Sequence, residues 1–344
     1  MARYTFVSFL ALLIALGSHV PLAQDIPSAI SADNVSLLRP ARLLSFDPQR
    51  ATVGWLALAD GGSLALREEV DRLALYDDQG NSWDTLDCPD FAVAQWIDSD
   101  TLVAACLLPQ GFSLRRWSRE QLDEWDFTEL DFLPFQVWGD GQALYAELQA
   151  RDPSAAPRVL RATSAEDVDL LPYPPADDPQ AVVRIGRITP PYVVTSSLDG
   201  QVSLWDMTSG KRIAQVDNGT GKPSVFGNIN ASATHLAWRD NDNRILYLLD
   251  LRTGENRVVA PLNGEYVQWF FVSSDASLIL GVGVGGAPSV VAWRVSDGQR
   301  LELGLYHAER PCSRPQPDMA QLSPDGRILA IGCSAGVELW QVSG

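Results

Sequence analysis

Basic residues are few in this chain of 344 residues, where Lys and Arg together number 26 against 43 for Asp and Glu. The formal net charge is therefore −17, and the isoelectric point lies near 4.5. Such a chain repels the phosphates of nucleic acid, so we expect no nucleic acid among its partners. The acidity indicates solubility, because like charges keep molecules apart. A cation-binding surface is the alternative interpretation.

Histidine is also rare, and only His19, His235 and His307 are present. A hydrolase triad needs a base, which is usually histidine. His19 lies at the edge of the first apolar segment and His235 enters a predicted strand, which leaves His307, in a predicted loop, as the candidate. The Gly-x-Ser-x-Gly, Cys-x-x-Cys and Asp-x-Asp-x-Asp-Gly motifs are all missing. We therefore predict no enzyme activity that depends on His or Cys, no catalytic residue, no metal site and no cofactor.

One apolar run, Phe6 to Leu16, stands near the start of the chain. Arg3 precedes it, and the small residues that follow offer cleavage sites after Gly17 or Ala23, so residues 1–23 have the layout of a secretory signal peptide. The run is shorter than the roughly 20 residues that span a bilayer, and no later stretch reaches that length. We predict an exported protein, extracellular, periplasmic or at the cell surface, whose residues 24–344 form one domain that is not inserted in a membrane.

Repeats organise the rest of the chain. The clearest unit is SLDGQVSLWDMTSG at residues 197–210, in which the turn Asp199-Gly200 leads into an alternating strand that ends in Trp205-Asp206. Weaker copies end at Gly254, Gly298 and Gly344, at intervals typical of one four-stranded repeat, about 40–45 residues. Each unit has one anchor residue at the equivalent position near the end of its predicted third strand, and the recurrence of this position predicts seven units. These anchors are Tyr76, Trp117, Leu160, Trp205, Leu249, Trp293 and Trp340.

Asp199, Trp205 and Asp206 give the clearest unit a close resemblance to a WD40 repeat. The resemblance implies an all-β fold, a seven-bladed β-propeller of four-stranded antiparallel blades. No Gly-His pair of the WD40 type is present, so a related propeller of the bacterial YVTN type is the alternative family. Together with the signal, the resemblance suggests a bacterial protein.

The last unit stops after its third strand. We therefore predict that residues 36–46 supply its outer strand and close the ring, which would protect exposed strand edges. Tryptophans recur in the first strand of several units, at Trp55, Trp96, Trp138 and Trp269, and we expect them to fill the space between blades. Carbohydrate stacking is the alternative role for some of them.

Four cysteines occupy matching places in two units. Cys88 and Cys312 precede a first strand, and Cys106 and Cys333 end the following second strand. An even count in an exported protein favours disulfides over free thiols. Among the three possible connectivities, Cys88–Cys106 with Cys312–Cys333 is the local one, and it places both bridges on the same face of the ring.

The function that the WD40 resemblance implies is a rigid scaffold for a protein or peptide partner. We expect the partner at the loop 304–317, where Arg310 and Arg314 alternate with prolines. Two alternatives stay open. One is a propeller enzyme, lactonase- or glycosidase-like, with acids or a metal at the mouth of the channel. The other is a purely structural extracellular module.

Overall fold

The computed structural model places most of the domain and leaves gaps between its parts. It describes residues 28–45, 56–69, 71–77, 79–88, 90–119, 121–128, 130–139, 142–152, 158–172, 192–197, 199–207, 209–217, 221, 225–229, 234–239, 245–262, 267–283, 290–301, 303, 315–333 and 336–342. Strands dominate these ranges, and two short 3-10 helices, η1 (Val35–Leu37) and η2 (Asp60–Gly62), complete the regular structure.

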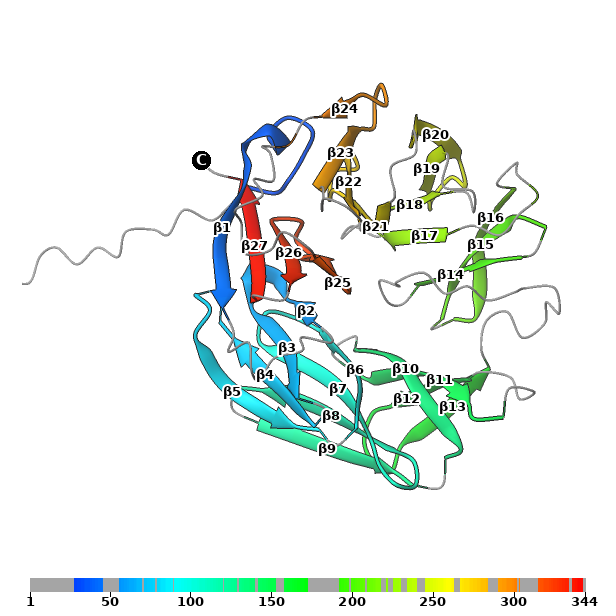
Figure 1. The fold of residues 1–344 in the computed structure, drawn as a ribbon. Helices are drawn as coiled ribbons and strands as arrows, with labels where there is room; N and C mark the ends of the chain where they lie inside the picture. The colour runs from blue at the N-terminus through cyan, green and yellow to red at the C-terminus, as the bar shows by residue number, and fades with distance from the viewer. Residues whose placement is uncertain are drawn as a thin grey trace, which may run out of the picture.

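Seven antiparallel sheets follow one another around a ring, one sheet for each blade (Figure 1). Blade 1 contains β2 (Leu56–Leu58), β3 (Leu64–Glu69), β4 (Arg72–Tyr76) and β5 (Ser82–Asp87). Blade 2 contains β6 (Phe91–Trp96), β7 (Thr101–Leu107), β8 (Phe112–Ser118) and β9 (Gln121–Phe127). Blade 3 contains β10 (Phe132–Gly139), β11 (Leu144–Ala150), β12 (Arg158–Ala162) and β13 (Val168–Pro172).

The second half of the ring repeats the pattern. The described part of blade 4 contains β14 (Tyr192–Ser196), β15 (Gln201–Asp206) and β16 (Lys211–Asp217). Blade 5 contains β17 (Val225–Ile229), β18 (His235–Arg239), β19 (Ile245–Asp250) and β20 (Asn256–Pro261). Blade 6 contains β21 (Val267–Val272), β22 (Leu278–Gly283), β23 (Val290–Arg294) and β24 (Arg300–Leu301). The predicted all-β seven-bladed propeller is confirmed.

Blade 7 joins the two ends of the domain. It contains β25 (Pro315–Leu322), β26 (Ile328–Cys333) and β27 (Gly336–Val342), and β1 (Leu38–Ser45) pairs with β27 as its outer strand. The register runs from Leu38 opposite Val342 to Ser45 opposite Gly336. The blue and red strands therefore lie side by side (Figure 1). The closure predicted for residues 36–46 is confirmed.

The hydrophobic core is divided among the interfaces between neighbouring blades. Seven clusters of buried residues each draw on two adjacent blades, and together they go once around the ring. Trp96, Trp138 and Trp269 are 5%, 4% and 7% exposed and belong to three of these clusters. The predicted filling role is thus confirmed for these three. Because every blade is packed on both sides, relative movement of two blades would open an interface.

Six of the seven predicted anchors lie in the third strand of their blades, and Trp205 lies in β15, the middle of the three described strands of blade 4. The seven anchors are found in β4, β8, β12, β15, β19, β23 and β27 in chain order. Several parts of the sequence-based interpretation lie outside the described residues: the signal peptide at residues 1–23, Trp55, His307, Cys312, and the loop 304–317 as far as residue 314. Residues 315–317 begin β25, which is described by its backbone, as is Cys333 at the end of β26.

Candidate functional site

One face of the ring is formed by the turns that join the first strand to the second and the third strand to the fourth in each blade. We call it the turn face. Its described turns carry many carboxylates, namely Asp60, Asp77, Asp98, Asp100, Glu166, Asp167, Glu255, Asp275, Asp297 and Asp325. The cationic side chains in the same described turns are Arg119, Arg252 and Arg327. The described turns of this face thus carry an excess of negative charge.

Asp side chains on the turn face also build the turns themselves. The hydroxyl of Ser273 donates to Asp275 Oδ1 at 2.6 Å, and Ser323 makes the matching bond to Asp325 at 2.6 Å in blade 7. In blade 2, Asp98 Oδ1 accepts the N–H groups of Asp100 and Thr101 at 2.8 and 2.7 Å. These bonds fix the turns, since short polar side chains hold local turns in this way.

A cleft of about 290 Å³ opens between blades 2 and 3 on the turn face. Blade 3 contributes Ala143 and Leu144, which form an aliphatic wall with Ile97 of blade 2. Among the described residues, the polar lining comes from blade 2 and consists of Asp98, Thr101, Arg116, Ser118, Gln121 and Asp123. The cleft therefore has one aliphatic side and one polar side.

Gly139 allows the two blades to approach each other beside the cleft. A Cβ atom at this position would stand 2.5 Å from Ile97 Cδ1 and 3.3 Å from Leu144 Cδ2. Real Cβ atoms do not come that close to carbon, so any larger residue would displace Ile97. The shape of the aliphatic wall thus depends on position 139 being a glycine, which has no side chain.

Arg116 and Asp123 form an ion pair in the lining, which also contains the carboxylate of Asp98. They face each other across β8 and β9, and the guanidinium Nε and Nη2 atoms lie 3.0 and 2.5 Å from Asp123 Oδ2. Gln121 Nε2 donates to Asp123 Oδ1 at 2.6 Å. The bond from Arg116, together with that from Gln121, lowers the pKa of the Asp123 carboxyl against the opposing effect of burial. Asp123 is consequently ionised at neutral pH.

Two arginines of blade 2 stack on aromatic rings, Arg116 on a ring of its own blade and Arg119 on a ring of blade 1. The guanidinium of Arg116 lies 5.7 Å from the ring centroid of Trp125, and that of Arg119 lies 5.0 Å from the ring of Trp83. Trp83 in turn contacts Trp117, with ring centroids 4.4 Å apart. Such cation–π contacts hold the long arginine side chains in place, so Arg116 reaches the cleft in a fixed position.

The residues that carry the WD40 resemblance serve the local structure of blade 4. Trp205 Nε1 donates to Thr195 Oγ1 at 3.0 Å, which joins β15 to β14. Asp206 accepts the Ser209 hydroxyl at 2.7 Å, and Asp199 accepts the hydroxyl of Ser197. All of these bonds lie within one blade.

His235 lies in blade 5, far along the chain from the cleft residues. Its Nδ1 lies 2.9 Å from Thr234 Oγ1, and its Nε2 lies 3.8 Å from Asp250 Oδ2. Burial lowers the pKa of His235 although Asp250 opposes this, so the ring is neutral at pH 7. In the described part of the chain, no group of three or more His, Cys, Asp and Glu side chains is arranged to hold a metal ion.

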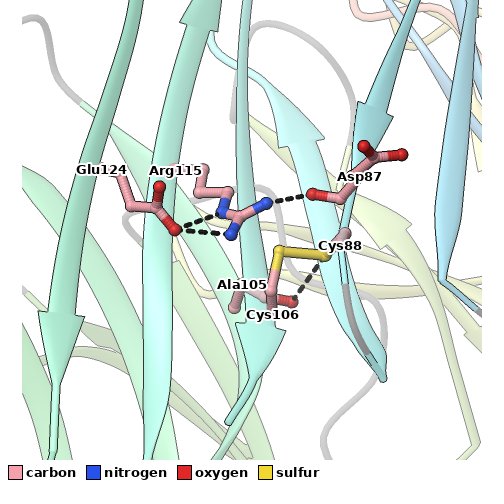
Figure 2. Close-up of a disulfide and its surroundings, with 6 residues drawn as sticks. All are labelled: Asp87, Cys88, Ala105, Cys106, Arg115 and Glu124. Atoms are coloured by element: carbon pink, nitrogen blue, oxygen red, sulfur yellow. Dashed lines mark hydrogen bonds and ion pairs between the residues drawn. A yellow bond between two sulfur atoms is a disulfide. The ribbon is translucent and has the colours of Figure 1, made fainter.

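The Cys88–Cys106 disulfide is present, with Cα atoms 5.2 Å apart (Figure 2). It joins the loop before β6 to the end of β7, at the edge of blade 2 opposite the turn face. Arg115 braces the same region, because it donates to the carbonyl of Asp87 and, through Nε at 2.9 Å, to Glu124 (Figure 2). The predicted first bridge is thus confirmed, and the pairing of Cys312 with Cys333 stays a prediction.

The cleft was not predicted from the sequence. Asp98 and Asp100 were visible as neighbouring acids, but acidic pairs are common in a chain with 43 carboxylates. The short turn after Ser118 could have indicated one part of the cleft. Counting residues along the hairpin from this turn places Arg116 opposite Asp123. Of the loop expected to bind a partner, 304–317, the structure describes only residues 315–317, at the start of β25.

Comparison with known proteins identifies the fold. No protein-family model matches the chain, and no curated protein sequence matches it either. The β-propeller domain of Cps50 (Swd1) from Myceliophteria thermophila superposes with a TM-score of 0.61 at 13% sequence identity, over 85% of this chain and 96% of that domain. The fold is a WD40-like seven-bladed propeller. Solved structures match in large number, 1438 chains, so this propeller fold does not by itself select one function.

Among the described residues, the structure contains no helix with the length and apolar character needed to cross a membrane.

Proposed function

We propose that this chain is an exported, non-enzymatic scaffold that binds a protein or peptide partner on its turn face. The observation that carries the proposal is the cleft between blades 2 and 3, in which an aliphatic wall faces an ordered set of polar groups. Pockets that recognise ligands combine these two kinds of surface. The WD40-like fold supports the proposal in general terms, since propellers present their loops and turns on a rigid ring.

Rigidity favours binding by such a surface. The cleft is bounded by blades 2 and 3, whose shared core includes Val103, Phe112, Val137 and Leu148, all fully buried. The Asp98 turn and the Arg116–Asp123 pair hold its polar side. A cleft that exists before the partner arrives costs little conformational entropy on binding.

Export is part of the same proposal and rests on two features of the chain. The first residues have the layout of a signal peptide, and Cys88 and Cys106 form a disulfide. Disulfides persist in oxidising compartments. N-terminal sequencing of the protein recovered from culture medium or periplasm tests this part: cleavage after Gly17 or Ala23 supports it, whereas an uncleaved cytosolic chain contradicts it.

The binding test uses the mature chain as bait for the envelope and secreted proteins of its source organism. Thr101→Arg places a long side chain in the cleft, and Val258→Arg makes the same change on β20, where Val258 is 60% exposed. We expect a partner that is retained by the wild type and by Val258→Arg and lost with Thr101→Arg. Equal retention by all three proteins would show that the cleft is not the binding site. Matching thermal midpoints would show that both variants fold.

A further inference from the structure

We propose that the cleft binds the side chain of a lysine or arginine that belongs to a basic segment of the partner. This inference rests on the proposed function and adds the chemistry of the occupant. It follows from four properties: the size of the cleft, its aliphatic wall, the bonding of its charged groups and the charge of the described turns around it.

Size restricts the occupant. Pockets for drug-sized ligands measure about 300–1,000 Å³, and this cleft, at about 290 Å³, lies just below that range. It therefore suits a single long side chain that enters from a bound peptide. A folded element of the partner would stay outside and contact the rim.

The lining suits a side chain with an apolar stem and a cationic tip. Ile97, Ala143 and Leu144 offer the aliphatic wall, and Asp98, together with the hydroxyl groups of Thr101 and Ser118, offers oxygen acceptors. Lysine and arginine lay their methylene groups along apolar surfaces and keep the charged end among polar groups. A carboxylate or phosphate would instead meet the carboxylates of Asp98 and Asp123, while the guanidinium of Arg116 is already directed to Asp123.

Arg116, the cation in the described lining of the cleft, is already bonded. Arg116 directs Nε and Nη2 to Asp123, and it stacks near Trp125. The two carboxylate oxygens of Asp98 differ in their hydrogen bonding. The N–H groups of Asp100 and Thr101 both bind Oδ1, and Oδ2 accepts no hydrogen bond from the residues that the structure describes. With Asp98 and Asp123 against Arg116, the described lining carries a net negative charge, which a cationic tip would neutralise.

The surroundings extend this preference beyond the cleft. The turn face carries mainly carboxylates in its described turns, and the whole chain has a formal net charge of −17. A basic segment would be attracted to this face before it makes any contact, and an acidic segment would be repelled. The occupant of the cleft and the charge of the face thus point to the same kind of partner.

The experiment measures binding of three fluorescein-labelled decapeptides by the full mature chain, at fixed ionic strength because salt screens such attraction. One alternates Lys with Gly, the second carries acetyl-lysine at the same positions, and the third carries Glu. We expect binding of the Lys peptide, and at least about fivefold weaker binding of the other two. Absence of binding by the Lys peptide, or preferential binding of the Glu peptide, would overturn the proposal.

Two isosteric variants separate the cleft from general attraction. Asp98→Asn keeps the oxygen that accepts the turn bonds and removes the charge. Asp297→Asn does the same in blade 6, where Asp297 Oδ1 accepts the N–H of Gln299 at 3.0 Å. We expect Asp98→Asn to weaken binding of the Lys peptide about fivefold and Asp297→Asn to weaken it less than about twofold. Equal effects of the two variants would refute a specific site in the cleft.

The outcome is distinguishable from failure of the proposed function. If Thr101→Arg abolishes capture of the natural partner but Asp98→Asn leaves binding of the Lys peptide unchanged, the cleft is a binding site for another chemistry. If Thr101→Arg leaves capture of the partner unchanged, the proposed function itself is wrong. If both variants weaken their respective interactions, both proposals are supported.

Discussion

Pro40 lies opposite Trp340 in the ladder that joins β1 to β27. Proline lacks a backbone N–H, so it is tolerated where a strand has a neighbour on one side only, and β1 is the outermost strand of blade 7. Trp340 is 1% exposed and belongs to the core between blades 6 and 7. The two ends of the domain therefore meet at Trp340, which pairs with β1 through its backbone and packs in the hydrophobic core through its side chain.

Removal of residues 24–46 should greatly destabilise the domain. The deletion takes away β1 and leaves β27 as an open edge. It also removes Ile30, Val35 and Leu38, which are almost fully buried in the core between blades 6 and 7. The residues before β1 also hold two turns, because Ile30 N–H donates to Gly326 O at 2.8 Å and Ala32 N–H to Ser277 Oγ at 3.0 Å.

Circular dichroism during heating measures this effect. We expect a lower and broader unfolding transition for the truncated chain, with partial recovery when a peptide of residues 24–46 is added. An unchanged midpoint would show that β1 contributes little to closure.

Gly336→Ala should weaken the same closure without any deletion. Gly336 has φ +143°, and a Cβ atom there would lie 1.8 Å from the carbonyl oxygen of Leu44 in β1. Backbone atoms cannot move aside as a flexible side chain can, so we expect a loss of about 2 kcal/mol or more in the free energy of unfolding. Gly210→Ala is the control, because its φ is +67° and nothing lies within 4 Å of the added atom. It should cost about 1 kcal/mol. Urea unfolding compares the two variants, and equal losses would contradict this account.

Much of the fold was predictable because the propeller repeats locally. The turn Asp199-Gly200 and the pair Trp205-Asp206 mark one blade, and the spacing carries the pattern to the others. The missing outer strand of the last blade followed from the same count. Cys88 and Cys106 were paired correctly because they stand at neighbouring strand ends within one blade.

The cleft could not be derived in the same way. The pairing of Arg116 with Asp123 is set by one hairpin, but the position of Leu144 relative to Ile97 is set by how blade 3 packs on blade 2. That packing depends on a missing side chain at Gly139 and on a core shared by many residues. Repeat spacing specifies which strands are neighbours and leaves the side-chain space between two blades undefined.

Loss of the Cys88–Cys106 bridge should cost about 2–3 kcal/mol of stability. The bridge closes a loop with a sequence separation of 18, and on the chain-entropy model a loop of this size contributes about 3 kcal/mol. The double variant Cys88→Ser with Cys106→Ser, unfolded in urea without reductant, isolates this bridge from any bond between the other two cysteines. A free energy of unfolding equal to that of the wild type would contradict the expectation. Peptide mapping without reduction tests the predicted Cys312–Cys333 pairing in the same preparation.

Asp60→Asn should stabilise the protein slightly at neutral pH. Burial and the nearby charge of Asp325 raise the pKa of Asp60 above its ordinary value of 3.8, so the folded state binds this proton more tightly than the unfolded state does. The ionised carboxylate therefore costs stability at pH 7, and the cost disappears as the pH falls through the folded-state pKa. We expect the thermal midpoint of Asp60→Asn to exceed that of the wild type by at most about 2 °C at pH 7, with no gain near pH 3. Asp84→Asn removes the same charge from an exposed position on the outer strand β5 of the same blade and is the control. A gain that persists at pH 3, or the same gain in Asp84→Asn, would show that the charge of Asp325 is not its cause.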